Sequence, residues 1–147
     1  MSIYEKLHKI QQALKVPKDA VNKFGNYNYR TAESILRTFK EKNEELNLSL
    51  ILMLSDEILS INNRFYVKAI ATLTDAEAKQ SVFVSAYARE AENKKGMDEA
   101  QVTGAASSYA RKYALNGLLA IDDGKDPDSQ EPVTEAKTTK GQQQITF

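Results

Sequence analysis

Cysteine is absent from the 147 residues, and histidine occurs once, at His8. The chain therefore has no disulfides and no thiolate metal sites, which fits a reducing compartment. One histidine argues against a Ser-His-Asp triad and against a histidine-based metal site. No apolar run approaches the roughly 20 residues that a membrane span requires, and the N-terminus lacks a signal-peptide pattern. We expect a cytoplasmic protein, the size of one domain, with no membrane partner.

A phosphate-binding loop of the form Gly-x-x-x-x-Gly-Lys-Ser/Thr is also missing. Gly124-Lys125 has neither the upstream glycine nor a preceding strand. ATP-driven strand exchange is therefore not supported, and we expect no cofactor and no enzymatic activity.

Two acidic segments resemble metal sites only superficially. Glu77-Ala78-Lys79, with Asp56 or Asp75 upstream, has the residue types of a Mg²⁺-dependent nuclease, but the triplet lies in a predicted loop. Nuclease sites need carboxylates that converge on the ion from ordered strands. The acidic residues 122–128 lack the glutamate and the flanking helices of a Ca²⁺ loop. We expect no metal site.

The formal charge is distributed unevenly along the chain. Residues 122–147 contain six acids and three lysines, a formal charge of −3, so residues 1–121 carry +3 because the whole chain is neutral. The tail is rich in polar residues and proline and nearly free of large apolar groups, which is typical of disorder. We therefore predict a body over 1–121 that suits a polyanion and an acidic disordered tail over 122–147, with Ile145 and Phe147 as a candidate docking element.

Apolar periodicity predicts two N-terminal helices. Ile3, Leu7, Ile10 and Leu14 recur at helical spacing, which indicates a helix over 2–15 that Pro17 ends. A second helix is expected from Thr31 to about Leu46. Between them lies a polar, aromatic connector, residues 23–30, whose glycine and asparagines favour turns.

Three strands and a long helix follow. Alternating apolar residues predict strands over 48–61, 64–73 and 81–89, with a bulge or turn at Asp56-Glu57 and a hairpin turn at Asn62-Asn63. Asp98 is a candidate cap for a helix over 99–119. The predicted class is α+β, a three-stranded antiparallel meander followed by a long helix. One helix face is expected to hold Val102, Ala105, Ala106, Tyr109, Ala110 and Tyr113, and the other Gly104, Ser107, Ser108, Arg111 and Leu115.

The long helix carries the first candidate binding site. Arg111 and Lys112 follow a run of small side chains, which would allow a phosphate backbone to approach closely. Ser107 and Ser108 add hydroxyl donors for phosphate oxygens. The same pattern also fits packing through a Gly104/Ser108 groove, with Arg111 extended to solvent.

The connector is the second candidate. In Tyr27-Asn28-Tyr29-Arg30, aromatic rings could stack on bases while the cation holds phosphate. Half-buried connector tyrosines with solvated hydroxyls explain the pattern equally well.

The third candidate is one face of the second strand, with Arg64, Tyr66 and Lys68, and Arg89 lies on the next strand. Several modules carry single-stranded nucleic acid on a basic, aromatic sheet face. A solvated face of an antiparallel sheet is the more common origin of such a pattern.

The run from Met97 to Leu115, followed by Asp122-Asp123 and Asp126, resembles the signature of the phage essential recombination function (Erf) family of single-strand annealing proteins. Three weaker segments resemble that family in the same order: Tyr27 to Arg30, Arg64 to Val67 and Ser85 to Arg89. The resemblance covers residues 3–128.

The resemblance implies an ATP-independent protein that coats single strands, assembles into rings or filaments and pairs complementary strands. It implies a β-β-β-α core, with the long helix on the sheet and DNA in a basic groove around the oligomer. Arg111 and Lys112 match the family's basic pair, and Tyr109 and Tyr113 match its flanking aromatics. Lys112 stands where many relatives have arginine, so it keeps the charge without bidentate geometry. Host or phage replication and recombination proteins are further expected partners.

Successive helical residues diverge by about 100°, so we expect at most one of the basic pair to face DNA, and Arg111 is our first choice. Two alternatives remain: a protein-interaction or regulatory domain of the same fold that does not anneal, and a Mg²⁺ nuclease that uses Glu77 and Lys79.

Overall fold

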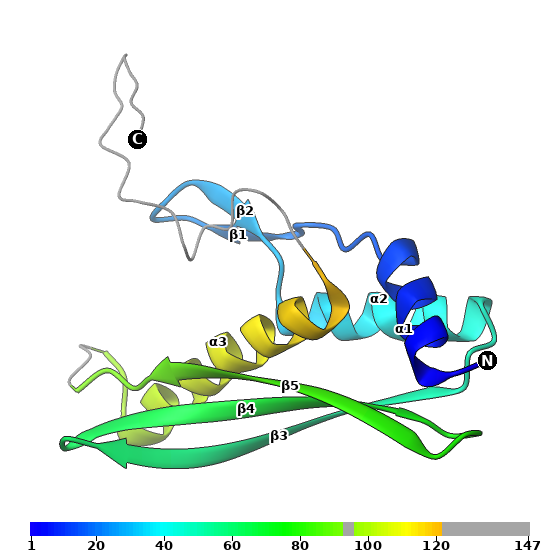
Figure 1. Cartoon of the computed structure of the whole chain (residues 1–147). Helices are drawn as coiled ribbons and strands as arrows, with labels where there is room; N and C mark the ends of the chain where they lie inside the picture. The colour runs from blue at the N-terminus through cyan, green and yellow to red at the C-terminus, as the bar shows by residue number, and fades with distance from the viewer. Residues whose placement is uncertain (93–95, 122–147) are drawn as a thin grey trace, which may run out of the picture.

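The computed structural model describes residues 1–92 and 96–121. The fold is of the α+β class that the sequence predicts (Figure 1). In chain order the elements are α1 (Ile3–Ala13), β1 (Ala20–Asn22), β2 (Tyr27–Tyr29), α2 (Ala32–Glu45), β3 (Leu50–Ile61), β4 (Arg64–Asp75), β5 (Gln80–Arg89) and α3 (Glu99–Leu119).

The main sheet is the antiparallel meander β3-β4-β5, as predicted. Asn62 and Asn63 adopt positive φ angles of 52° and 62° and form the two-residue turn between β3 and β4. The predicted break at Asp56-Glu57 is wrong, because β3 pairs with β4 one residue to one residue along its whole length. The two acidic residues do not interrupt the strand pairing. Glu57 stands opposite Lys68 on β4, and Asp56 accepts a hydrogen bond from Arg111 of the long helix.

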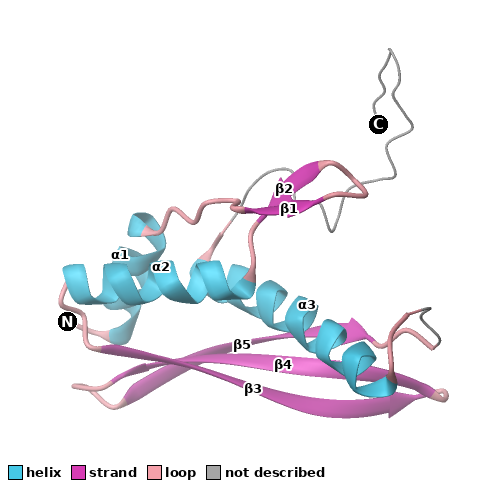
Figure 2. Cartoon of the chain, turned by 180° about the vertical axis from the view of Figure 1, so that it is seen from behind, coloured by secondary structure: helices cyan, strands magenta, loops and turns pink. Residues whose placement is uncertain are grey.

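The long helix α3 lies across one face of this sheet (Figures 1 and 2). The sheet face against it consists of fully buried, mostly small residues of β4: Val67, Ala69, Ala71 and Leu73. Ala106, Ala110 and Ala114 of α3 are also buried, so small side chains on both elements allow close approach. Asp98 caps the helix with a reciprocal Gln101 contact, which confirms the predicted start.

The predicted division of α3 into two faces is partly wrong. Leu115, assigned to the face opposite the alanines, is fully buried with them, whereas Tyr109 is half exposed and Lys112 is buried. The physical reason is that α3 packs on more than one side, against the sheet and against α1 and α2. A helix covered in this way has no single apolar stripe for periodicity to identify.

The N-terminal elements cover the side of α3 away from the sheet. Helix α1 begins at a Ser2–Glu5 capping box and ends at Ala13, and α2 is capped by Thr31 and ends one residue before Leu46. Residues 23–26 of the connector form the turn that its glycine and asparagines favour, but the residues on either side pair as the hairpin β1-β2, which was not predicted. Figure 1 shows that this hairpin projects on the far side of α3 from the sheet. The proposed disordered tail, including Ile145 and Phe147, lies outside the described residues.

Within the part of the chain that the structure describes, no helix has the length and apolar character needed to cross a membrane.

Candidate nucleic-acid interface

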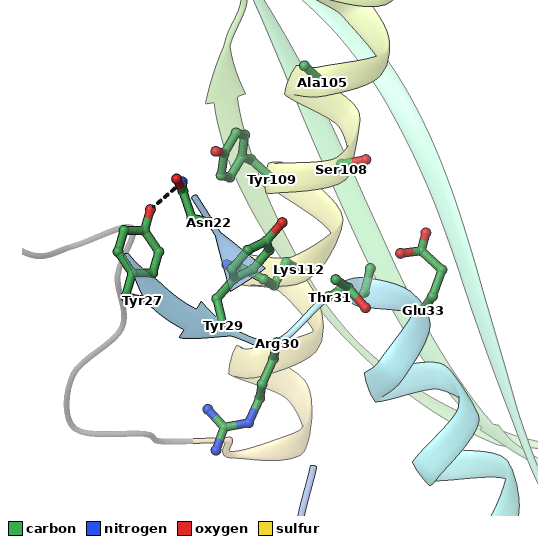
Figure 3. A pocket seen from close by; sticks show the side chains of 11 residues that line it. Asn22, Tyr27, Tyr29, Arg30, Thr31, Glu33, Ala105, Ser108, Tyr109 and Lys112 are labelled. Atoms are coloured by element: carbon green, nitrogen blue, oxygen red, sulfur yellow. Dashed lines mark hydrogen bonds between the residues drawn. The ribbon is translucent and has the colours of Figure 1, made fainter. Parts of the chain in front are cut away.

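A pocket of about 290 Å³ lies between the β1-β2 hairpin, the start of α2 and the exposed side of α3 (Figure 3). Its volume is near the lower end of the range for small-molecule sites, which is about 300–1,000 Å³. The pocket joins two of the three candidate sites, which are far apart in the sequence. The predicted residues that line it are Tyr27, Tyr29, Arg30, Ser108, Tyr109 and Lys112.

Lys112 places its ammonium group among aromatic rings. The Nζ atom lies 5.6 Å from the ring centre of Tyr29 and 5.9 Å from those of Tyr109 and Tyr113. Only 6% of Lys112 is exposed. Cation–π contacts of this kind stabilise a partly desolvated lysine by about 0.5–2 kcal/mol. The positive charge is thus held at a fixed position in the wall of the pocket.

The hairpin that carries Tyr27 and Tyr29 is attached to the body at both ends. Before β1, Asp19 accepts a hydrogen bond from the Ser34 hydroxyl at 2.7 Å and pairs with Arg37 at 3.0 Å. The Ser34 hydrogen bond lowers the pKa of the Asp19 carboxyl below its ordinary value, because it favours the ionised form that accepts it. After β2, Arg30 Nε donates to the carbonyl oxygen of Val16 at 2.9 Å. The pocket wall is therefore preorganised.

Hydrogen bonds also hold the tip of the hairpin in place. Asn22 Oδ1 accepts the backbone N–H groups of Phe24 and Gly25, and Asn22 Nδ2 donates to the Tyr27 hydroxyl at 2.9 Å. A Cβ atom on Gly25 would lie only 2.2 Å from the Tyr27 ring, so any other residue there would force that ring to move. The turn leaves Phe24 fully exposed. Sequence reasoning missed this hairpin, although the Asn22-x-x-Gly25 spacing before an alternating Tyr-Asn-Tyr is a usable turn signal.

Arg111 has a different environment from Lys112. Its Nε atom lies 3.1 Å from Asp56 Oδ1 of β3, and the Ser107 hydroxyl donates to Asp56 Oδ2 at 2.6 Å. The two basic residues therefore diverge, as the helical spacing predicts. Arg111 and Ser107 connect α3 to β3, whereas Lys112 faces the pocket. The expectation that Arg111 is the main DNA contact stays a prediction. The geometry favours Lys112 for that role.

The remaining candidates lie on the other side of the sheet. Tyr66 pairs across strands with Arg89, and Lys68 pairs with Tyr87, on the face that points away from α3. Lys68 Nζ lies 5.9 Å from the Tyr87 ring centre, and Arg64 forms an ion pair with Glu92 at 3.1 Å. The structure therefore does not bring these residues to the pocket, and the predicted site divides between two surfaces.

The acidic residues proposed for a nuclease are held by a lysine. Lys6 Nζ lies 2.9 Å from Asp75 Oδ1 and 2.7 Å from Glu77 Oε1. The hydrogen bond from Lys6 lowers the pKa of the Asp75 carboxyl. The third carboxylate, Asp56, is paired with α3 instead. Among the described residues no cluster of three or more acids or histidines is arranged to hold a metal ion.

Comparisons with known proteins agree on one family. A family model described as the ERF superfamily matches residues 3–146. The chain is 56% identical, over 128 residues and 87% of its length, to the Essential recombination function protein of Salmonella phage P22. It spans 60% of the length of that relative. No solved structure matches the chain.

Proposed function

This chain belongs to the ERF superfamily, and on that premise we propose that it binds single-stranded DNA and promotes annealing of complementary strands without ATP. The name of its phage P22 relative, Essential recombination function protein, supports a role in recombination. We place the activity in the cytoplasm of a host bacterium and class the protein as a binding protein, not an enzyme.

The observation that carries the proposal is the pocket in which Lys112 lies among tyrosines. Rings offer stacking surfaces that accept any base, at about 1–3 kcal/mol per base. The lysine supplies positive charge for a phosphate, and the exposed Ser108 at the rim supplies a hydroxyl donor. None of these groups reads a base edge. Binding of this kind neutralises the backbone and leaves sequence to be read by pairing with a second strand.

A single pocket holds too few cations for tight binding. Useful affinity then comes from many subunits on one strand, because each additional contact within an assembly is effectively intramolecular. We therefore include self-assembly into a ring or filament in the proposed function. Phage or host replication and recombination proteins are the further partners that this role would require.

A salt titration tests the binding step. Fluorescence anisotropy with labelled oligonucleotides of unrelated sequence is expected to show similar affinities, a clear preference for single strands over duplexes and a steep loss of affinity with salt. A protein without preference for single strands contradicts the proposal. If the protein still binds DNA after substitution of both Tyr29 and Lys112, the DNA site lies elsewhere on the chain. The alternative of a protein-interaction domain would then be favoured.

A further inference from the structure

The sheet has one face that no described helix covers. All three helices and the β1-β2 hairpin lie on the other side of β3-β4-β5 (Figures 1 and 2). The strand residues on the uncovered face alternate with the buried row Val67, Ala69, Ala71 and Leu73. We call this surface the open face.

Aromatic side chains and cations interleave on the β4-β5 part of the open face. Phe83 is 69% exposed and Tyr87 is 52% exposed, and Tyr66 lies beside them on β4. Tyr87 stands opposite Lys68, whose ammonium lies over its ring, and Tyr66 stands opposite Arg89. Tyr66 and Tyr87 therefore each stand beside a cation, whereas Phe83 stands opposite Thr72 and offers an exposed ring alone.

The open face carries a small excess of positive charge. Among its strand residues the cations are Arg64, Lys68 and Arg89 and the only acid is Glu57 of β3, opposite Lys68, while Arg64 is paired with Glu92 beyond the end of β5. Single-stranded nucleic acid uses both kinds of side chain, with bases on the rings and phosphates on the cations.

We propose that the open face binds a second strand of DNA while the Lys112 pocket holds the first. This inference rests on the proposed function and extends it to both partners of the annealing step. The pocket and the open face lie on opposite sides of the α3–sheet layers, so one strand does not obstruct the other (Figure 2). Because the two surfaces lie on opposite sides, the open face serves to capture the second strand, which must leave that face before it pairs with the first.

A two-strand capture experiment tests the inference. The full chain is saturated with an immobilised oligothymidylate, and a labelled oligothymidylate containing 5-iododeoxyuridine, which cannot pair with the first, is then added. We expect retention of the second strand and photo-crosslinks in peptides that contain Phe83 or Tyr87. The variant Phe83→Ser/Tyr87→Ser is expected to retain the second strand about tenfold less well. It should bind the first strand within about twofold of the unmodified protein, because both side chains are on the surface.

The matched control is Ile51→Ser/Met53→Ser, which removes two exposed apolar side chains from the same face, outside the aromatic area. This control is expected to capture the second strand normally. The inference is overturned if crosslinks occur only in the hairpin and α3, if the aromatic variant captures normally, or if it loses self-association instead of DNA.

The proposed function fails separately from the inference. If Lys112→Gln leaves binding of the first strand unchanged, the pocket is not the primary site, whatever the open face does. If the unmodified protein retains no single strand, both proposals are wrong.

Discussion

Lys112 is the residue on which the proposed binding site depends most. Its ammonium lies within 6 Å of three tyrosine rings, contributed by β2 and by α3 itself. Aromatic rings attract a cation through the electrons of their faces and carry no formal charge themselves. Arginine at this position would add bidentate geometry but would also require a larger space between the rings.

Substitution of each basic residue separates their roles. We expect Lys112→Gln to weaken single-strand binding about tenfold and to reduce the salt slope by about 0.7, because one phosphate contact is lost. Arg111→Gln is the matched control, since it removes the same charge from the neighbouring residue. It is expected to change DNA affinity little and to lower the free energy of unfolding by up to about 1 kcal/mol, through loss of the partly exposed Asp56 ion pair. Salt titrations and urea unfolding of both variants give the comparison. The reverse pattern would restore Arg111 as the primary contact.

The buried Lys6–Asp75 pair predicts a specific dependence of stability on pH. Lys6 lowers the pKa of Asp75 from its ordinary value of 3.8. A carboxyl group with a depressed pKa stabilises the fold fully above its unfolded value, and this contribution is lost as the pH falls through the folded value. We therefore expect stability to fall as the pH drops below 3.8, and Asp75→Asn to make that loss shallower.

The control for this pH series is Glu77→Gln. Glu77 contacts the same lysine but is 72% exposed, where ion pairs contribute little. Thermal unfolding across the acid range should therefore be nearly as steep for Glu77→Gln as for the unmodified protein. An equally steep acid loss in Asp75→Asn would show that the pair does not control it.

At the scale of the elements, local signals predict boundaries better than they predict packing. Helix α3 begins at the cap that Asp98 indicates, and the meander follows from apolar alternation and the Asn62-Asn63 turn. The β1-β2 hairpin could not be predicted in the same way. Its strands have three residues each, and contacts distant in sequence, from Asp19 and Arg30, fix it in place.

The candidate site could not be predicted for the same reason, because it depends on packing between segments that are distant in the sequence. The sequence provides the residue types of all three candidate sites, but nothing local indicates that Tyr29 and Lys112 meet while Tyr66 faces away. That outcome depends on which side of α3 the hairpin covers, which is a property of tertiary packing. Helical spacing correctly predicted that Lys112 and Arg111 point in different directions. It could not indicate which of the two faces the pocket.

Glycine in α3 gives a test at this scale. A Cβ atom on Gly104 would meet nothing within 4 Å. Gly104→Ala is therefore expected to raise the free energy of unfolding by about 0.5–1 kcal/mol, because alanine favours the helix. On Gly117 the added Cβ would lie 3.1 Å from Val84 Cγ1, so Gly117→Ala should gain less. Urea unfolding of the two variants measures the difference. An equal gain at both sites would show that α3 is less closely packed on β5 than the structure indicates.

The whole molecule is a set of layers: the sheet, then α3, then the N-terminal helices and the hairpin (Figure 1). The layers keep the Lys112 pocket and the open face apart, on opposite sides. Under the proposed function, this arrangement allows one subunit to capture two strands on separate surfaces. The proposal also requires repeated copies to supply most of the binding energy.

Assembly is therefore expected at the scale of the molecule. Negative-stain electron microscopy should show rings or filaments, with single-stranded DNA increasing their number or length. A matched sample with duplex DNA serves as the control. Particles the size of one chain under every condition would contradict the multivalent account of affinity.

The most direct test of the central claim is the rate at which two complementary oligonucleotides, labelled with a fluorescence donor and acceptor, anneal in the absence of ATP. The account predicts that the protein accelerates pairing well above the spontaneous rate, and that Tyr29→Ala/Lys112→Gln removes most of the acceleration while Arg111→Gln keeps it. Pairing at the spontaneous rate with the unmodified protein, or acceleration that appears only when ATP is added, would contradict it.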